Sequence, residues 1–173
     1  MIAGIRLIIR DKTAFSEEEG VRRRLGRPMD LLGSIPKSVK LIHVLDLNAK
    51  NGNMTNFDLY DHMMYKFNVE IESAPEPALL RKLFAFGARA VVELPFGKRL
   101  EEFEGSRLLA GKTDGKETDE FVQDYYVETE NLEMVARLAR SRKRIFVHSE
   151  KLEDSELEKA GAFAAIRNFR IRV

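Results

Sequence analysis

Polar side chains that could do chemistry stand at the ends of several apolar runs. They are Asp46, Glu72, Glu93, Lys112, Glu128, His148 and Arg167. If the runs are parallel strands, their carboxyl ends meet on one side of the sheet, where ligands bind. Carboxylates beside an imidazole could supply an acid/base pair or hold a divalent cation through oxygen ligands. The sequence therefore predicts catalytic roles for Asp46, Glu72, Glu93 and His148, and ligand binding by Lys112, Glu128 and Arg167.

The same residue types have a plainer interpretation. Strand ends are polar wherever they meet water, so the set could be a solvated rim. Side chains also alternate along a strand, so adjacent residues cannot all point inward. His148 could be a hydrogen-bonded structural histidine, and His43 a histidine of the core or of the helix-facing layer. These residue types are compatible with a divalent cation and equally with no cofactor.

The elements that must position these residues alternate along the chain. Apolar runs predict eight strands, at Ile2–Ile9, Lys40–Asn48, Val69–Ser73, Ala88–Leu94, Ser106–Ala110, Val122–Glu128, Arg144–His148 and Ala162–Val173. The helices predicted between them include Phe57–Tyr65, one ending at Gly87, Asn131–Arg142 and Leu152–Ala160. Strands alternating with helices at this spacing are typical of βαβ units and a parallel sheet. The sequence predicts one domain, residues 1–173, folded as a compact α/β barrel of the (β/α)₈ type.

The predicted helices are trimmed after strands four, five and eight. Phe96–Gly105 leaves room for two or three turns, and Thr118–Phe121 predicts only a short capped stub. Thr13–Pro28 is charged, without a clear period, and predicts a long loop whose arginines face water or grip a phosphate. Missing helices would leave apolar strand faces uncovered, so we expect a homo-oligomer that covers them.

Composition narrows the classes of function. Lys and Arg number 29 against 28 Asp and Glu, so no charge excess attracts nucleic acid or a membrane surface, and neither partner is expected. The chain has no cysteine for disulfides or thiolate metal sites, and no run long enough to span a membrane. A cytoplasmic protein is the expectation. Charged residues at 33% without Cys also fit a heat-adapted protein.

The stretch Leu41–Ala49, followed by Asn56, resembles the ProFAR isomerase family, the sugar-phosphate isomerases of histidine biosynthesis. That family has a strand ending Val-Asp-Leu-Asp-Gly-Ala and an Asn that opens the next helix; this chain has Leu-Ile-His-Val-Leu-Asp-Leu-Asn-Ala. The strand and helix layout also matches over Val69–Pro95. The resemblance covers Ile2–Pro95 and implies a (β/α)₈ barrel with a small, sugar-phosphate-like ligand at its mouth, with Asn48 among the ligand-binding residues.

The chemistry of that family does not carry over. It uses one Asp at the end of strand one and another at the end of strand five, where this chain has Ile9 and Gly111, and neither can move a proton. Asp11 could replace the first only if the strand end shifts. Glu72-Ser73-Ala74 stands in place of phosphate-binding glycines, and a carboxylate repels a phosphate. We expect a divergent relative with a different, isomerase- or lyase-like reaction, or alternatively a non-catalytic structural protein that oligomerises.

Overall fold

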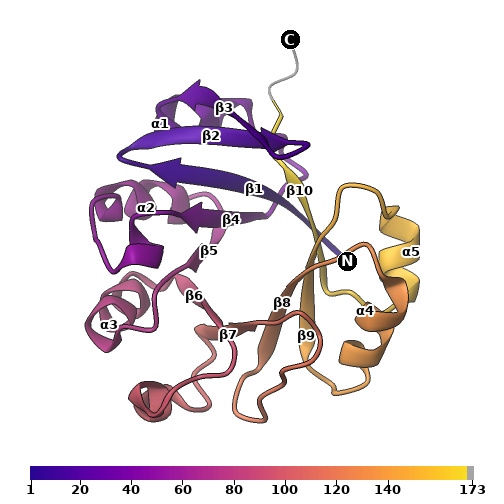
Figure 1. Cartoon of the computed structure of the whole chain (residues 1–173). Coiled ribbons are helices and arrows are strands. Elements are labelled where there is room, and N and C mark those ends of the chain that lie inside the picture. Colours follow the sequence, from indigo (N-terminus) through magenta and orange to yellow (C-terminus); the bar gives the residue numbers. More distant parts are fainter. Residues whose placement is uncertain (171–173) are drawn as a thin grey trace.

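Eight parallel strands close into a barrel in the computed structural model, which describes residues 1–170. In order around the ring they are β1 (Ile2–Arg10), β4 (Leu41–Asp46), β5 (Asn68–Glu72), β6 (Arg89–Glu93), β7 (Leu109–Lys112), β8 (Asp124–Glu128), β9 (Arg144–His148) and β10 (Ala164–Asn168). Each strand pairs with the next, and the pairing of β10 with β1 closes the ring (Figure 1). The predicted fold class, a compact (β/α)₈ barrel, is confirmed.

Helices lie outside this ring where the chain returns between strands (Figure 1). They are α1 (Pro28–Leu31) with the 3₁₀ turn η1 (Leu32–Ser34), then η2 (Ala49–Asn51), α2 (Phe57–Met64), α3 (Pro77–Phe86), α4 (Leu132–Ala139) and α5 (Asp154–Lys159). Local sequence sets their ends. Pro77 begins α3, and Gly87, with a φ of 83°, ends it in the left-handed conformation that glycine permits. The side chain of Asn131 caps α4 by accepting a hydrogen bond from the Met134 N–H.

Two connections lack a regular α-helix. The chain after β6 forms the 3₁₀ segment η3 (Lys98–Phe103), and residues 113–123 after β7 form only turns and coil. The strands are covered nevertheless, because Leu94 and Phe96 pack against the apolar cluster over β8 and β9, and Leu100 and Phe103 join the cluster over β4 to β6. The outer faces of β6 and β7 are therefore buried within the chain, so they give no support to an oligomer that forms by covering them.

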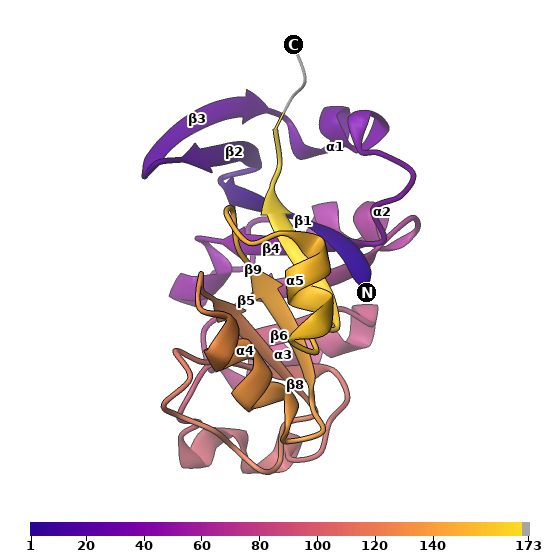
Figure 2. The ribbon, with the colours of Figure 1, turned by 90° about the vertical axis from the view of Figure 1, so that its right-hand side faces the viewer.

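The segment predicted as a long loop, Thr13–Pro28, is instead mainly a β-hairpin. β2 (Thr13–Glu18) pairs with the end of β1 and with β3 (Val21–Gly26), antiparallel in both cases. Glu19 and Gly20 have φ of 51° and 78°, the pair of positive values that a tight hairpin turn requires. Figure 2 shows the hairpin extending beyond the barrel. Most of its side chains meet solvent, which explains why no apolar period marks these strands.

A shorter prediction was also wrong. Thr118–Phe121 forms no helix; the Lys143 ammonium instead donates hydrogen bonds to the carbonyls of Asp119 and Glu120, at 2.6 and 2.8 Å. The last strand ends at Asn168, and the predicted continuation through residues 171–173 lies outside the described residues. None of the helices within residues 1–170 has the length and apolar character to span a membrane.

Candidate functional site at the barrel mouth

The inside of the barrel combines charged and polar side chains with an apolar cluster. The inward-facing charged and polar residues are Arg6, His43, Glu70, Glu72, Arg89, Lys112, Asp124, Tyr126, Glu128, Arg144 and His148. The apolar cluster includes Leu41, Val91, Ala110, Phe146, Ala164 and Ile166, which alternate with the outward residues in the same way. The residues between them, such as Leu7, Val44 and Val127, are apolar and pack against the outer layer. Contacts across the ring establish the inward direction, since His43 of β4 stacks on Tyr126 of β8 with ring centroids 3.9 Å apart.

His43 lies at the centre of this interior. Its Nδ1 is 3.4 Å from Oε2 of Glu70, and its Nε2 is 3.1 Å from Oε1 of Glu72. Burial alone would lower the pKa of His43, but the hydrogen bonds and charges of the two glutamates outweigh it and raise the pKa above 6.5. The His43 ring thus lies between two carboxylates and over the face of Tyr126, surroundings that favour its protonated form. His43 is a core histidine that faces the interior rather than the helices.

Lys112 joins two of the predicted residues near the mouth. Its Nζ lies 2.9 Å from Oε2 of Glu72 and 2.7 Å from Oε1 of Glu128. Burial would raise the pKa of Glu72, but His43 and Lys112 lower it to about 2. Burial likewise opposes ionisation of Glu128, yet His148, Arg6 and Lys112 lower its pKa well below the usual range. Both carboxylates are therefore ionised at neutral pH and are weak bases.

Unpaired polar atoms gather around Glu128. Arg6 Nη2 lies 3.6 Å from Oε1 of Glu128, and His148 Nδ1 lies 3.8 Å from Oε2. Within residues 1–170, Nε of Arg6, the hydroxyl of Tyr126 and Nε2 of His148 are buried and have no hydrogen-bond partner. A buried polar atom without a partner is costly. This part of the interior would therefore be stabilised by the polar atoms of a ligand.

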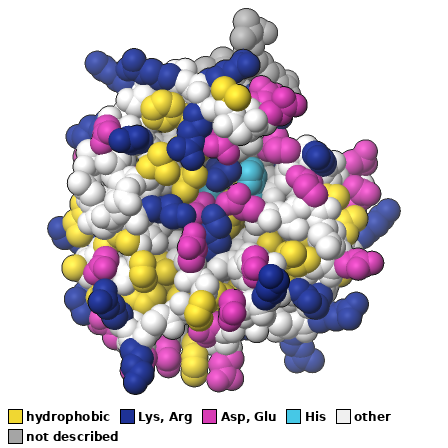
Figure 3. Space-filling view, viewed as in Figure 1, with side chains coloured by type: hydrophobic (Ala, Val, Ile, Leu, Met, Phe, Trp, Pro, Cys, Tyr) yellow, Lys and Arg dark blue, Asp and Glu magenta, His cyan; other side chains and the backbone are white. Residues whose placement is uncertain are grey.

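Two hollows adjoin this cluster at the mouth. The larger, of about 430 Å³, is lined by Glu93, Leu94, Lys112, Thr113, Asp114, Glu117 and Glu128. The smaller, of about 170 Å³, includes Glu72 and Ser73. Lys50 connects them, with its Nζ 3.1 Å from Glu93 and 3.5 Å from Glu72. Carboxylates outnumber cations in the larger hollow, which favours neutral or cationic ligands over phosphates. Figure 3 shows acidic and basic side chains mixed around a histidine on the viewed face.

Asp46 faces outward from the barrel and is fully buried. Its Oδ1 accepts hydrogen bonds from the N–H groups of Asn48 and Ala49, at 2.8 and 3.0 Å, and from Nδ2 of Asn56 at 2.9 Å. The hydroxyl of Tyr60, on α2, donates to Oδ2. Asp46 thus fixes the turn between β4 and α2 and does not join the cluster around Glu128.

Asp11 and Asn48 meet at the rim beside that turn. Asn48 Nδ2 donates to Oδ1 of Asp11 and the Asp11 N–H donates to Oδ1 of Asn48, both at 2.8 Å. Arg167 also points away from the interior; it bonds the carbonyls of Ser149 and Leu152 and, at 2.7 Å, Oδ1 of Asp154. Of the predicted residues, the structure brings together Glu72, Glu93, Lys112, Glu128 and His148, and it places Asp11, Asp46, Asn48 and Arg167 elsewhere.

Ile9 and Gly111, the two positions aligned with the catalytic aspartates of the isomerase family, do not face the mouth of the barrel either. Ile9 belongs to the apolar cluster outside the strands. Gly111 also faces outward, because a Cβ built on it would lie 2.9 Å from Cδ1 of Leu94. In the part of the chain that the structure describes, no three His, Asp or Glu side chains converge to hold a metal ion.

The sequence interpretation missed Arg6, Glu70 and the unpaired hydroxyl of Tyr126 as parts of the site. A period of two could have revealed them, since Arg6 stands between Ile5 and Leu7, and Glu70 between Val69 and Ile71. Strands buried on both faces are normally almost continuously apolar. Such alternation in a closed barrel indicates a polar interior.

Comparison of the sequence with models of protein families and with curated proteins gives no match in either case. A relation to the ProFAR isomerase family accordingly rests on the sequence layout over residues 2–95 alone.

Proposed function

We propose that the protein binds a small polyol or sugar at the mouth of its barrel, and that His148 exchanges protons with it. The observation that carries this proposal is the set of buried, unpaired polar atoms around Glu128, from Arg6, Tyr126 and His148. A hydroxyl group both donates and accepts hydrogen bonds, so the hydroxyls of a ligand in the larger hollow could pair with Lys112 and Glu128, which line it beside these atoms. A phosphate would add negative charge beside Glu72 and Glu128.

Within this site His148 is the group best suited to proton transfer. Imidazole is the side chain that most often exchanges protons near neutral pH. Nδ1 of His148 faces Glu128, which can orient the ring, while Nε2 makes no hydrogen bond within residues 1–170 and lies 3.6 Å from Oε1 of Glu150. Lys112, held as an ammonium by Glu72 and Glu128, can stabilise negative charge that develops on a carbonyl oxygen. One base and one fixed cation suit an isomerase- or lyase-like reaction at a carbon next to a carbonyl.

The proposed lineage is a divergent branch of the ProFAR isomerase type of barrel. The strand and helix layout over Ile2–Pro95 supports it. The outward positions of Ile9 and Gly111 and the carboxylate of Glu72 support a ligand and a reaction different from those of the parent family.

A calorimetric titration with sugars, amino sugars and polyols, chosen by a thermal-shift screen, tests this function. We expect saturable binding by the wild-type chain, and binding at least about tenfold weaker in His148→Gln, because a buried hydrogen bond is lost. The matched control is His62→Gln, a change at an exposed histidine of α2. A bound reducing sugar, which has a carbonyl in its open-chain form, should also exchange the proton on the carbon next to that carbonyl with D₂O in the wild type and not in His148→Gln. Absence of binding in the screen, or equal binding by His148→Gln, would contradict the proposal.

A non-catalytic interaction role is the second candidate, and exposed aromatic side chains favour it. Tyr65 and Phe86 are 89% and 41% exposed, and Phe86 lines an apolar hollow with Met54 and Phe57. If light scattering shows a stable homo-oligomer and calorimetry shows no binding of any polyol, this role is favoured over the first. A monomer that binds polyols would favour the first.

A further inference from the structure

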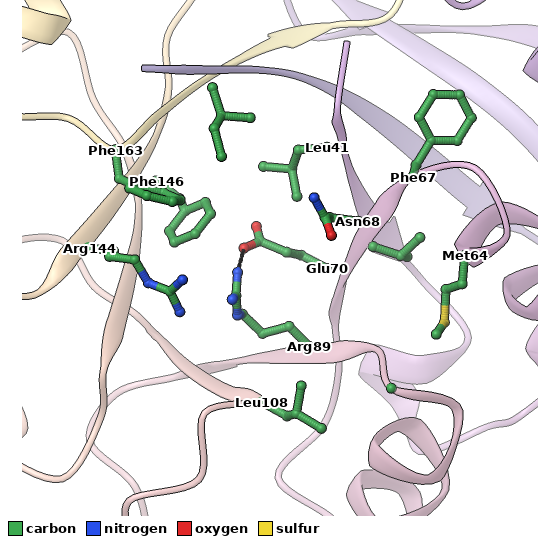
Figure 4. Close-up of a pocket in the computed structure, with 13 residues that line it drawn as sticks. Leu41, Met64, Phe67, Asn68, Glu70, Arg89, Leu108, Arg144, Phe146 and Phe163 are labelled. Atoms are coloured by element: carbon green, nitrogen blue, oxygen red, sulfur yellow. Dashed lines mark hydrogen bonds and ion pairs between the residues drawn. The ribbon is translucent and has the colours of Figure 1, made fainter.

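A second cavity opens at the opposite, amino-terminal end of the barrel. Its volume is about 360 Å³, and residues at the starts of β4, β5, β6 and β9 line it. Figure 4 shows the guanidinium groups of Arg89 and Arg144 directed into it, with Phe146 and Phe163 on one side and Met64 on the other. None of the residues that the sequence marks as functional lines this cavity.

The carboxylates of this end are fully paired. Oε1 of Glu70 accepts a hydrogen bond from Nη1 of Arg89 at 2.6 Å, and its Oε2 faces His43. The two carboxylate oxygens of Asp124, Oδ1 and Oδ2, accept hydrogen bonds from Nε and Nη2 of Arg144 at 2.6 and 2.7 Å. Glu70 and Asp124 are 1% and 0% exposed, so neither has an oxygen open to a ligand.

The arginines, in contrast, keep unused donors. Nε of Arg89 is buried without a hydrogen bond, although it lies 3.0 Å from Oδ2 of Asp124. Nη2 of Arg89 and Nη1 of Arg144 have no partner within residues 1–170. Because the spare hydrogen-bonding capacity of these arginines consists of cationic N–H groups, a ligand that completes it is an acceptor, and a negatively charged one fits best.

Apart from Asn68, the remaining walls of the cavity are apolar and aromatic. The ring centroids of Phe146 and Phe163 lie 5.2 Å apart, and Cζ of Arg144 lies 5.2 Å from the ring centroid of Phe163. Leu108 and Met64 complete the apolar lining. Such surfaces favour a flat apolar group that can stack on a phenyl ring.

We propose that this cavity is a second binding site, for a small aromatic carboxylate. The planar carboxylate matches the fork of a guanidinium, with Arg144 as the accessible partner and Arg89 as the buried one. The aromatic part of the ligand packs between Phe163, Met64 and Leu108. The cavity volume falls within the range of small-molecule sites, roughly 300–1,000 Å³.

Benzoate is the probe for this site, titrated into the full chain by calorimetry. Benzamide keeps the ring but loses the charge, and acetate keeps the charge but loses the ring; we expect each to bind at least tenfold more weakly than benzoate. Arg144→Gln and Leu108→Trp should each weaken benzoate binding at least tenfold, the first by removing donors and the second by filling the cavity. Arg140→Gln, at the exposed arginine that directly follows α4, is the matched control and should bind benzoate as the wild type does.

His148→Gln, at the other end of the barrel, separates the two sites and should leave benzoate binding unchanged. If Arg144→Gln fails to fold, the benzoate affinity of Leu108→Trp is sufficient to test the site. No benzoate binding to the wild type, normal binding by both cavity variants, or loss of binding in His148→Gln would each overturn this second site. A failure of polyol binding leaves these outcomes unaffected, so the two proposals can fail separately.

Discussion

Glu72 is a carboxylate with 2% side-chain exposure, yet it accepts contacts from His43, Lys50 and Lys112. Moving charges out of water costs several kcal/mol per ion, and pairing them usually does little more than recover that cost. The network is therefore weak as a source of stability. It does fix the positions of charges, which a binding site requires.

Glu72 should also shape the stability of the protein in acid. Its pKa is about 2 in the fold against an ordinary 4.5, so its contribution is present above pH 4.5 and is lost as pH falls toward 2. A shift of this size corresponds to about 3 kcal/mol. The free energy of unfolding, measured with urea from pH 2 to 7, should therefore fall less steeply below pH 4.5 in Glu72→Gln than in the wild type. The exposed control Glu133→Gln should keep the steep fall, and an unchanged fall in Glu72→Gln would show that Glu72 is not held ionised.

Residue types were enough to predict part of the site. Whether each predicted side chain belongs to it depends on whether the side chain faces into the barrel or away from it. Glu72, Lys112, Glu128 and His148 were identifiable because polar residues that end apolar strands face one mouth. Asp46 satisfied the same criterion, but it is one residue out of phase with His43 and so faces α2. Sequence alone could not give this phase, because a shift of one residue moves a side chain to the other face of a strand.

Among the elements, the loop after β6 does the work of a missing helix. Leu94 rests directly on Gly111 of β7, where a Cβ would lie 2.9 Å from Cδ1 and 3.0 Å from Cγ of Leu94. Gly111→Ala should therefore lower the free energy of unfolding by about 1–3 kcal/mol, the usual cost of overpacking. Chemical denaturation measures this change. Gly33→Ala is the control, since a Cβ there meets nothing within 4 Å. Equal stabilities of the two variants would show that Leu94 does not pack on Gly111.

The elements themselves were predictable where local signals agree. Apolar strands at regular spacing, the Asn131 cap and the glycine after α3 gave the barrel repeat and several helix ends. The β2–β3 hairpin was not predictable in the same way, because its strands are charged and largely exposed. Its one clear signal was the Glu19-Gly20 turn, where glycine supplies a positive φ.

At the scale of the whole molecule, ion pairs run through the barrel from one end to the other. Arg89 contacts Glu70, which faces His43; His43 contacts Glu72, and Lys112 joins Glu72 to Glu128. The barrel could be predicted because the outward residues of its strands are apolar and regularly spaced. The pairing of its interior side chains could not, since it depends on which side chains meet across a closed ring.

The most direct test of this charged interior is the titration of His43 by NMR in histidine-labelled protein. The chain has three histidines, and the spectra of His62→Gln and His148→Gln assign the remaining signal to His43. Glu70 and Glu72 raise the pKa of His43, so its ring should remain mostly protonated at pH 6.5 and lose its proton only at higher pH. Glu72→Gln should move that transition to lower pH. A His43 ring that is mostly neutral at pH 6.5, or a transition unaffected by Glu72→Gln, would contradict the account.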